Sequence, residues 1–139
     1  MEDLIVYTDG AYSPLRDQGG IGIVFVKDGK KIAQYSKMYP KTSNNQMEIG
    51  AVIIALKSIN LNQFSRIIIR TDSQYVIGCA SLNWKRKKNP KLWEQYDSIA
   101  KQIKESETEL IFEWVKGHNG DTYNELADDL AQSASQIMT

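Results

Sequence analysis

Four carboxylates are spaced along the chain so that strands and helices could gather them at one place. Asp9 and Asp72 each end an apolar, strand-like run that closes in Thr-Asp. If these runs are neighbouring parallel strands, both carboxylates lie at the strand ends, where open α/β sheets bind their ligands. Glu48 lies in an apolar, helix-like run, and Asp128 follows a loop that contains His118. Four acids at one point repel one another unless a cation joins them, so we expect a divalent-metal site.

Such a site suits the hydrolysis of phosphate esters. Mg²⁺ prefers carboxylate, phosphate and water ligands. Two ions about 4 Å apart can stabilise both the attacking and the leaving oxygen of an in-line displacement. Side chains alternate along a strand, so Tyr7 shares a face with Asp9, and Arg70 shares a face with Asp72. The spacing therefore permits the two aspartates to meet.

Each of these residues also has an ordinary explanation. Glu48 could be a first-turn glutamate favoured by the helix dipole, although it continues an apolar stripe. Asp128 and Asp129 compete for the fourth position, because helical periodicity does not choose between them, and either could lie on a solvated helix surface. His118 is the single histidine and lies between two glycines, where it could transfer protons or help product leave.

The elements that must position these residues follow the order βββαβααβα. Strands are expected over 4–8, 21–27, 31–39, 66–71 and 110–115, and helices over 46–59, 74–82, 90–106 and 124–137. We expect 10–20 to be a polar turn, Asp28-Gly29 to be a hairpin turn, and Asn44 or Asn45 to cap the first helix. Ser73 can cap the second helix, and Pro90 can begin the third. The last helix is expected to bury Leu126, Leu130, Ala134 and Ile137.

This order predicts an α/β fold with a mixed five-stranded sheet flanked by helices. The first three strands should be antiparallel, and the later strands parallel. At 139 residues, we expect a single domain over 1–139.

Composition limits the function classes. Seventeen basic and seventeen acidic residues balance, so no global charge indicates a partner. The lone Cys79 excludes an internal disulfide and suits a reducing compartment. The start, Met1-Glu2-Asp3, does not resemble a signal peptide, and no apolar run is long enough to span a bilayer. We therefore expect a cytoplasmic protein with no membrane association, and a monomer.

One segment is strongly basic. The segment 84–91 begins with Trp84 and holds five cations in eight residues. It is either a solvated basic turn with an anchoring tryptophan or a surface that attracts a nucleic-acid strand.

Five segments, taken together, resemble type 1 ribonuclease H. They match its pattern in order and span essentially the whole chain: Tyr7-Thr8-Asp9-Gly10-Ala11, 42–48 (TSNNQME), 71–76 (TDSQYV), 114–118 (WVKGH) and 124–131 (NELADDLA). Each match is weak alone, but five in the right order and spacing are highly specific.

The resemblance implies an RNase H-like fold and an endonuclease that cuts the RNA strand of RNA–DNA hybrids, using two Mg²⁺ ions or Mn²⁺ in their place. It implies that Asp9, Glu48, Asp72 and Asp128 bind the metal ions and act in catalysis, with His118 as the loop histidine. The family pattern Ala-Asp-x-Leu-Ala favours Asp128 over its neighbour. Eight residues are expected to contact the substrate: Gly10, Ser43, Asn44, Asn45, Gln74, Trp84, Lys85 and Asn124.

Among these, Asn44, Asn45 and Gln74 match residues that contact the minor groove of the hybrid. Ser43 matches a position that binds a phosphate of the DNA strand. Two segments depart from the family pattern. Leu15 replaces an asparagine that often touches the RNA, although Arg16 could supply a phosphate contact, and 84–91 stands where many members carry a longer basic protrusion.

Three other functions compete with this one. A non-catalytic hybrid- or RNA-binding module would gain nothing from four repelling acids. A DNA nuclease of the same superfamily, such as a resolvase or an integrase, would not need Asn44, Asn45 and Gln74. A domain cut from a reverse transcriptase fits less well, because the chain has a self-contained length and a complete histidine loop.

Overall fold

The computed structural model describes residues 2–117 and 120–138 and contains one mixed five-stranded sheet. The strands are β1 (Glu2–Ser13), β2 (Gln18–Lys27), β3 (Lys30–Pro40), β4 (Phe64–Thr71) and β5 (Glu109–Trp114). Their order in the sheet is β3-β2-β1-β4-β5. The pairs β3–β2 and β2–β1 are antiparallel, and the pairs β1–β4 and β4–β5 are parallel. The predicted fold class is confirmed.

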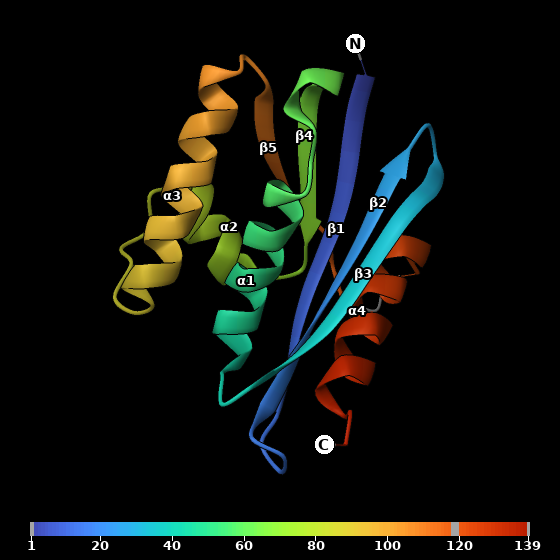
Figure 1. Ribbon diagram of the computed structural model, residues 1–139, viewed down its shortest axis with the longest axis vertical. Helices are drawn as coiled ribbons and strands as arrows, with labels where there is room; N and C mark the ends of the chain where they lie inside the picture. The colour runs from blue at the N-terminus through green and yellow to red at the C-terminus, as the bar shows by residue number, and fades with distance from the viewer. Residues whose placement is uncertain (1, 118–119, 139) are drawn as a thin grey trace.

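Four α-helices cover the two faces of the sheet (Figure 1). They are α1 (Asn44–Lys57), α2 (Gln74–Ser81), α3 (Pro90–Glu105) and α4 (Thr122–Ser135), and a 3₁₀ turn (Leu61–Gln63) precedes β4. The helices α1, α2 and α3 lie on one face, and α4 lies on the other (Figure 1). In the described part of the chain, no helix has the length and apolar character needed to cross a membrane.

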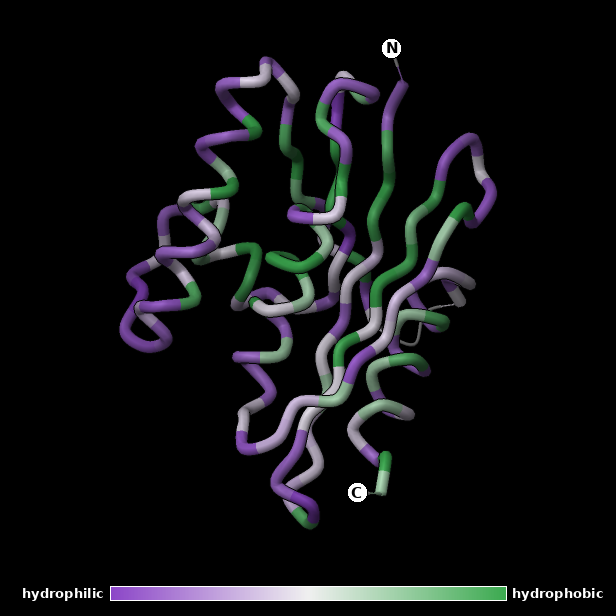
Figure 2. Tube along the Cα trace, in the orientation of Figure 1, coloured by the Kyte–Doolittle hydropathy of each residue, from purple (hydrophilic) through white to green (hydrophobic). Residues whose placement is uncertain are grey.

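The central strands bury side chains on both faces. Leu4 and Val6 of β1 belong to the larger core, under α1, whereas Tyr7 packs with Val24 and Ala127 in a smaller core under α4. Figure 2 shows hydrophobic residues along the central strands, while the tip of the β2–β3 hairpin and the outer turns of α3 are hydrophilic. The alternation expected for β1 therefore holds, with each face covered by a different helix layer.

The predicted core stripe of α4 is wrong in part. The most buried side chains facing the sheet include Ala127, Ala131 and Ala134, whereas Leu126 and Leu130 are only partly buried. Ile137 lies beyond the end of the helix and is 49% exposed. The cause is the β2 backbone: a Cβ atom added at its glycines 20 or 22 would collide with carbonyl oxygens of α4. The helix lies so close to this strand that only small side chains fit between them.

Three local predictions are corrected. The polar turn predicted over 10–20 covers only 14–17, because β1 continues to Ser13, which pairs with Gln18. Asp9 therefore lies within β1 and not at the end of the strand, where it was predicted to lie. The cap of α1 is Ser43, whose side chain accepts a hydrogen bond from the Gln46 amide at 3.2 Å. The helix therefore begins at Asn44, ahead of the predicted start, and Glu48 lies in its second turn.

Two predicted helix starts are confirmed. Ser73 caps α2 by accepting a hydrogen bond from the Val76 amide at 3.2 Å. Pro90 is the first residue of α3, where its missing N–H leaves no hydrogen bond unmade.

Candidate active site

The pairing of β1 with β4 places two aspartates side by side. The strands are parallel, and Tyr7 lies opposite Arg70. The Tyr7 hydroxyl accepts a hydrogen bond from Arg70 Nη1 at 2.8 Å, so these two side chains share a face of the sheet. Two residues after Tyr7, Asp9 lies on β1. Two residues after Arg70, Asp72 follows the last residue of β4.

Glu48 of α1 completes a close group of three acids. A Cβ atom on Gly10 would collide with the backbone of Met47 and Glu48, so glycine is needed for α1 to approach β1 here. Carboxylate oxygens from Asp9, Glu48 and Asp72 all lie within 4.8 Å of one another. Asp9 is 5% exposed and Glu48 6%, which is unusual burial for acids.

Asp128 of α4 joins this group from the other side of the sheet. Its carboxyl group shares a hydrogen bond with Asp9, and its side chain is partly buried. The neighbouring Asp129 is exposed. The geometry therefore distinguishes two residues that helical periodicity left equivalent.

Burial and mutual repulsion raise the pKa values of the two most buried acids. The pKa of Asp9 rises to about 8 because of burial first, then the charge of Asp72 and the hydrogen bond with Asp128. The pKa of Glu48 is raised well above its usual range by burial and by the charges of Asp9 and Asp72. Near neutral pH, Asp9 therefore holds a proton unless a cation replaces it.

The donor set fits a hard divalent cation. All of its atoms are oxygens, the ligand type that Mg²⁺ and Mn²⁺ prefer. Asn124 lies one turn before Asp128 and is 2% exposed, and its Oδ1 atom has no hydrogen-bond partner within the described part of the chain. A buried acceptor beside crowded acids suits a hydrated ion, whose water molecules are hydrogen-bond donors.

The segment after β5 lies against the acids. The Val115 amide donates to the Thr71 carbonyl at 2.9 Å and so extends the β4–β5 pairing. A Cβ atom on Gly117 would lie 2.9 Å from Asp72 Oδ2, so glycine lets this segment come close to the carboxylate. His118, the predicted proton-transfer residue, lies outside the described residues.

The first turns of α1 and α2 flank the acids and carry most of the predicted substrate contacts. Asn44 and Asn45 are in the first turn of α1, one turn before Glu48, and both are exposed. Gln74 is exposed as the first residue of α2, directly after the Asp72 turn. These amide side chains therefore lie at the surface beside the acids, while Ser43 and Ser73 cap the two helices.

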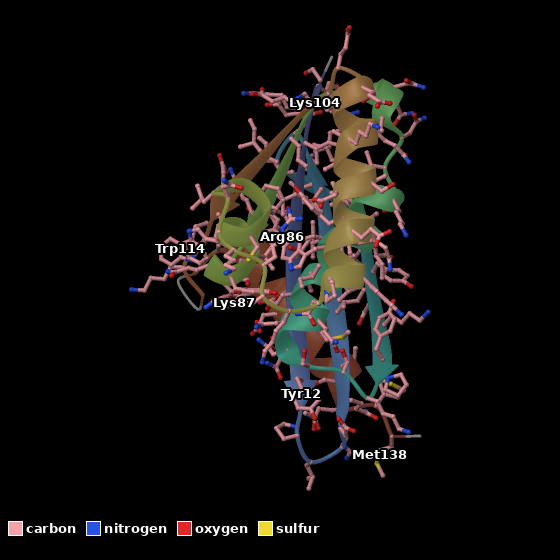
Figure 3. All side chains as sticks on the ribbon, turned by 90° about the vertical axis from the view of Figure 1, so that its left-hand side faces the viewer. Tyr12, Arg86, Lys87, Lys104, Trp114 and Met138 are labelled. Atoms are coloured by element: carbon pink, nitrogen blue, oxygen red, sulfur yellow. The ribbon has the colours of Figure 1, made fainter. Side chains whose placement is uncertain are left out.

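The basic segment contains an ordered anchor that sequence reasoning missed. Arg86 donates through Nε to the Cys79 carbonyl at 3.1 Å and pairs with Asp97 at 2.7 Å. Its guanidinium carbon also lies 4.6 Å from the centre of the Trp93 ring. Figure 3 shows Arg86 directed among the helices, and Lys87 nearer the edge of the molecule. Nothing in the sequence distinguishes the role of Arg86 from that of its basic neighbours, because its partners lie in the helices α2 and α3.

Trp84 is also held in place by contacts with α2, but half of its side chain remains exposed to solvent. Its ring lies on Gly78, where a Cβ atom would collide with it, and its amide donates to the Gly78 carbonyl at 3.0 Å. The side chain is still 50% exposed. Lys85, Lys87 and Lys88 are exposed. Trp84 and these three lysines are therefore presented to solvent by a segment that Arg86 anchors to α2 and α3.

Comparisons with known proteins agree on one family. The RNase H family model matches residues 1–136. The ribonuclease H of Trichodesmium erythraeum is 34% identical, over 96% of this chain and 89% of that protein. Among solved structures, RNase H1 from the halophilic archaeon Halobacterium salinarum is 28% identical, with a TM-score of 0.77 over 95% of this chain and 96% of that one. LC11-RNase H1, solved in complex with an RNA/DNA hybrid, is 26% identical, with a TM-score of 0.77 over 94% and 95%.

The raised pKa of Asp9 predicts how stability depends on pH without metal. In the folded protein this group keeps its proton up to about pH 8, whereas in the unfolded chain it loses it near 3.8. Because the folded state binds more protons within this window, stability should fall as pH rises through it. Asp9→Asn removes this titration, so the variant should unfold at a higher temperature than the unaltered protein at pH 8, with the gap closing toward pH 4. Thermal unfolding in metal-free buffer measures this, and a gap that does not change with pH would contradict it.

Proposed function

The chain belongs to the RNase H family, and we propose that it is an endoribonuclease that hydrolyses the RNA strand of RNA–DNA hybrids. The observation that carries this proposal is the close group of acids that β1, α1 and the end of β4 bring together, two of which are buried. A related enzyme of the same fold, LC11-RNase H1, is known in complex with an RNA/DNA hybrid, which supports this substrate class.

Asp9, Glu48, Asp72 and Asp128 are proposed to hold two Mg²⁺ ions, with Mn²⁺ as a substitute. Bound there, the ions would supply a hydroxide nucleophile near neutral pH and neutralise the departing 3′-oxygen, leaving 5′-phosphate and 3′-hydroxyl ends. The chain's own contribution is a rigid set of ionised oxygens whose protons leave as the ions bind. Asn124 Oδ1, buried one turn before Asp128, is placed to accept a hydrogen bond from water or substrate.

Substrate recognition is proposed to come from the surfaces beside the acids. Asn44, Asn45 and Gln74 belong to the first turns of α1 and α2 and suit the edges of bases in a minor groove. Gly10 lets α1 approach closely, and Ser43 lies at the helix N-terminus, where an anion is favoured.

The basic segment is proposed to hold the DNA strand through Trp84 and Lys85. A half-exposed indole ring can stack on a sugar or base, and the lysines attract phosphates. His118 is proposed to transfer a proton or to help product leave. That 1–139 form one catalytic domain, and that the protein is a cytoplasmic monomer, stay predictions from the sequence.

The competing functions suit the site less well. A pure hybrid-binding module would carry the free-energy cost of crowded buried acids and gain no binding from them. A DNA nuclease could use the same acids, but the amides of Asn44, Asn45 and Gln74 beside them are better suited to a hybrid.

The direct test is cleavage of one labelled strand presented in four forms. These are RNA–DNA hybrid, duplex RNA, single-stranded RNA and duplex DNA, each with Mg²⁺, with Mn²⁺ and with EDTA. We expect metal-dependent cleavage of the RNA in the hybrid alone, with phosphate on the 5′ end of each new fragment. Binding of the hybrid without cleavage in either metal would favour the binding module, and cleavage of duplex DNA would overturn the substrate.

The position of Asp128 predicts unequal effects of two neighbouring substitutions. Asp128→Asn removes a charge beside Asp9, so hybrid cleavage should fall by roughly 100-fold or more, a loss typical of an essential electrostatic group. Asp129→Asn, on the exposed side of the same helix, is the matched control and should retain nearly full activity. Steady-state kinetics in Mg²⁺ compares them, and equal losses would refute the assignment.

The structure separates Lys85, Lys87 and Lys88, three exposed lysines of the basic segment, from the anchored Arg86. Replacing Lys85, Lys87 and Lys88 with alanine should weaken hybrid binding and reduce the slope of log affinity against log salt. The reduction should be about one for each phosphate that a lysine no longer neutralises. Fluorescence anisotropy with Ca²⁺ in place of Mg²⁺ measures this without cleavage.

A second triple variant controls for net charge. Lys30, Lys101 and Lys104 are also exposed, and Figure 3 shows Lys104 far along the molecule from Lys87. Their replacement with alanine should leave the salt slope unchanged. If both triple variants have the same slope, 84–91 is only a solvated turn.

A further inference from the structure

A chain of polar contacts lies directly behind the acids and joins the elements that carry them. The Tyr7 hydroxyl accepts from Arg70 Nη1 at 2.8 Å and donates to Asp121 Oδ2 at 3.2 Å. Arg70 also pairs through Nε with Glu113 at 2.8 Å. Asp121 is the N-cap of α4, where its other carboxylate oxygen accepts from two backbone amides. These contacts link β1, β4 and β5 to the start of α4.

Three members of this polar chain, Tyr7, Arg70 and Asp121, belong to or adjoin the elements that carry acids of the site. Tyr7 lies two residues before Asp9, on the same face of β1, because strand side chains alternate. The same spacing separates Arg70 from the acid that follows β4. Asp121 begins the helix that carries Asp128 about two turns later. The polar chain therefore connects both strands to the helix at the level of the site.

The packing of α4 alone does not fix Asp128 along the helix axis. Small residues of α4 lie on the glycines of β2, and such apolar contact has little directional preference. Hydrogen bonds depend on distance and angle, so they fix position more sharply. Gln18 and Ser36 donate to carbonyls in the C-terminal half of α4. At the cap and first turn of α4, the side-chain bonds to the sheet and its β2–β3 turn within the described residues come from Tyr7 and Tyr123, ahead of the bond that Asp128 shares with Asp9.

We propose that Tyr7 is a positioning residue for the carboxylate site. Held by Arg70, its hydroxyl fixes Asp121 and the first turns of α4. This sets the position of Asp128 relative to Asp9. Tyr7 is 4% exposed, so its hydroxyl acts through the protein and not by touching substrate. The inference rests on the proposed function, since it concerns the same site.

Tyr7→Phe tests the proposal by removing one oxygen atom and keeping the buried ring. We expect kcat for hybrid cleavage to fall roughly 10- to 100-fold, because small misplacements of reacting groups have effects of this size. KM for the hybrid should change much less than kcat, since most of the proposed contacts come from α1, α2 and the basic segment. Mn²⁺ affinity of the protein without hybrid, measured by titration calorimetry, should fall several-fold.

Tyr123→Phe is the matched control. Tyr123 is in the first turn of the same helix, and its hydroxyl donates to the Gly29 carbonyl at 3.1 Å. Gly29 lies in the turn between β2 and β3, which carry none of the four acids. We expect a loss of thermal stability similar to that of Tyr7→Phe, with kcat and Mn²⁺ affinity unchanged.

Asp121→Ser provides a second route if Tyr7→Phe does not fold. Serine is as good a helix cap as aspartate but is too short to reach the Tyr7 hydroxyl, so the variant should reproduce the loss of kcat and of Mn²⁺ affinity. The proposal is overturned if Tyr7→Phe and Asp121→Ser keep kcat and Mn²⁺ affinity within about twofold of the unaltered protein. It is also overturned if Tyr123→Phe lowers kcat and Mn²⁺ affinity as much as those variants do. If the unaltered protein does not cleave the hybrid, the proposed function fails, and the Mn²⁺ affinities still decide this inference.

Discussion

The crowding of acids in a buried place is the constraint on which the rest of the structure depends. Carboxylates that lie within 4.8 Å of one another and away from water are costly to ionise, as the raised pKa values of Asp9 and Glu48 reflect. A flexible chain would relieve this repulsion by moving the acids apart. They stay together because each is carried by an element that packing and hydrogen bonds hold in place.

Glycine makes this crowding possible in three different ways. Gly10 lets α1 approach β1, so that Glu48 reaches the acid on that strand. Gly20 and Gly22 let α4 lie on the β2 backbone, which brings Asp128 to the site from the opposite face. Gly117 lets the segment after β5 approach the carboxylate that follows β4. In each case a single added Cβ atom would push an acid, or its neighbour, away from the others.

The proposed substrate contacts and the acids occupy adjacent surfaces of the same elements. The helix α1 carries amide side chains in its first turn and, one turn later, a buried acid. The basic segment is held by Arg86 against α3, so its lysines point outward from a rigid support. A nucleic-acid strand bound on these surfaces would be placed over the acids without any change in the fold.

The sequence alone determined the class of the fold and the family, and it singled out the three acids that the structure brings together, because alternation and short motifs are local signals. Helical periodicity could not choose between Asp128 and Asp129, since both lie off the expected apolar stripe, and only the family motif favoured the first. The tertiary structure supplied the physical reason, because the face that α4 buries is set by the glycines of β2, which are distant in sequence. The roles of Arg86 and Tyr7 also depend on partners brought together by folding, so no local pattern reveals them.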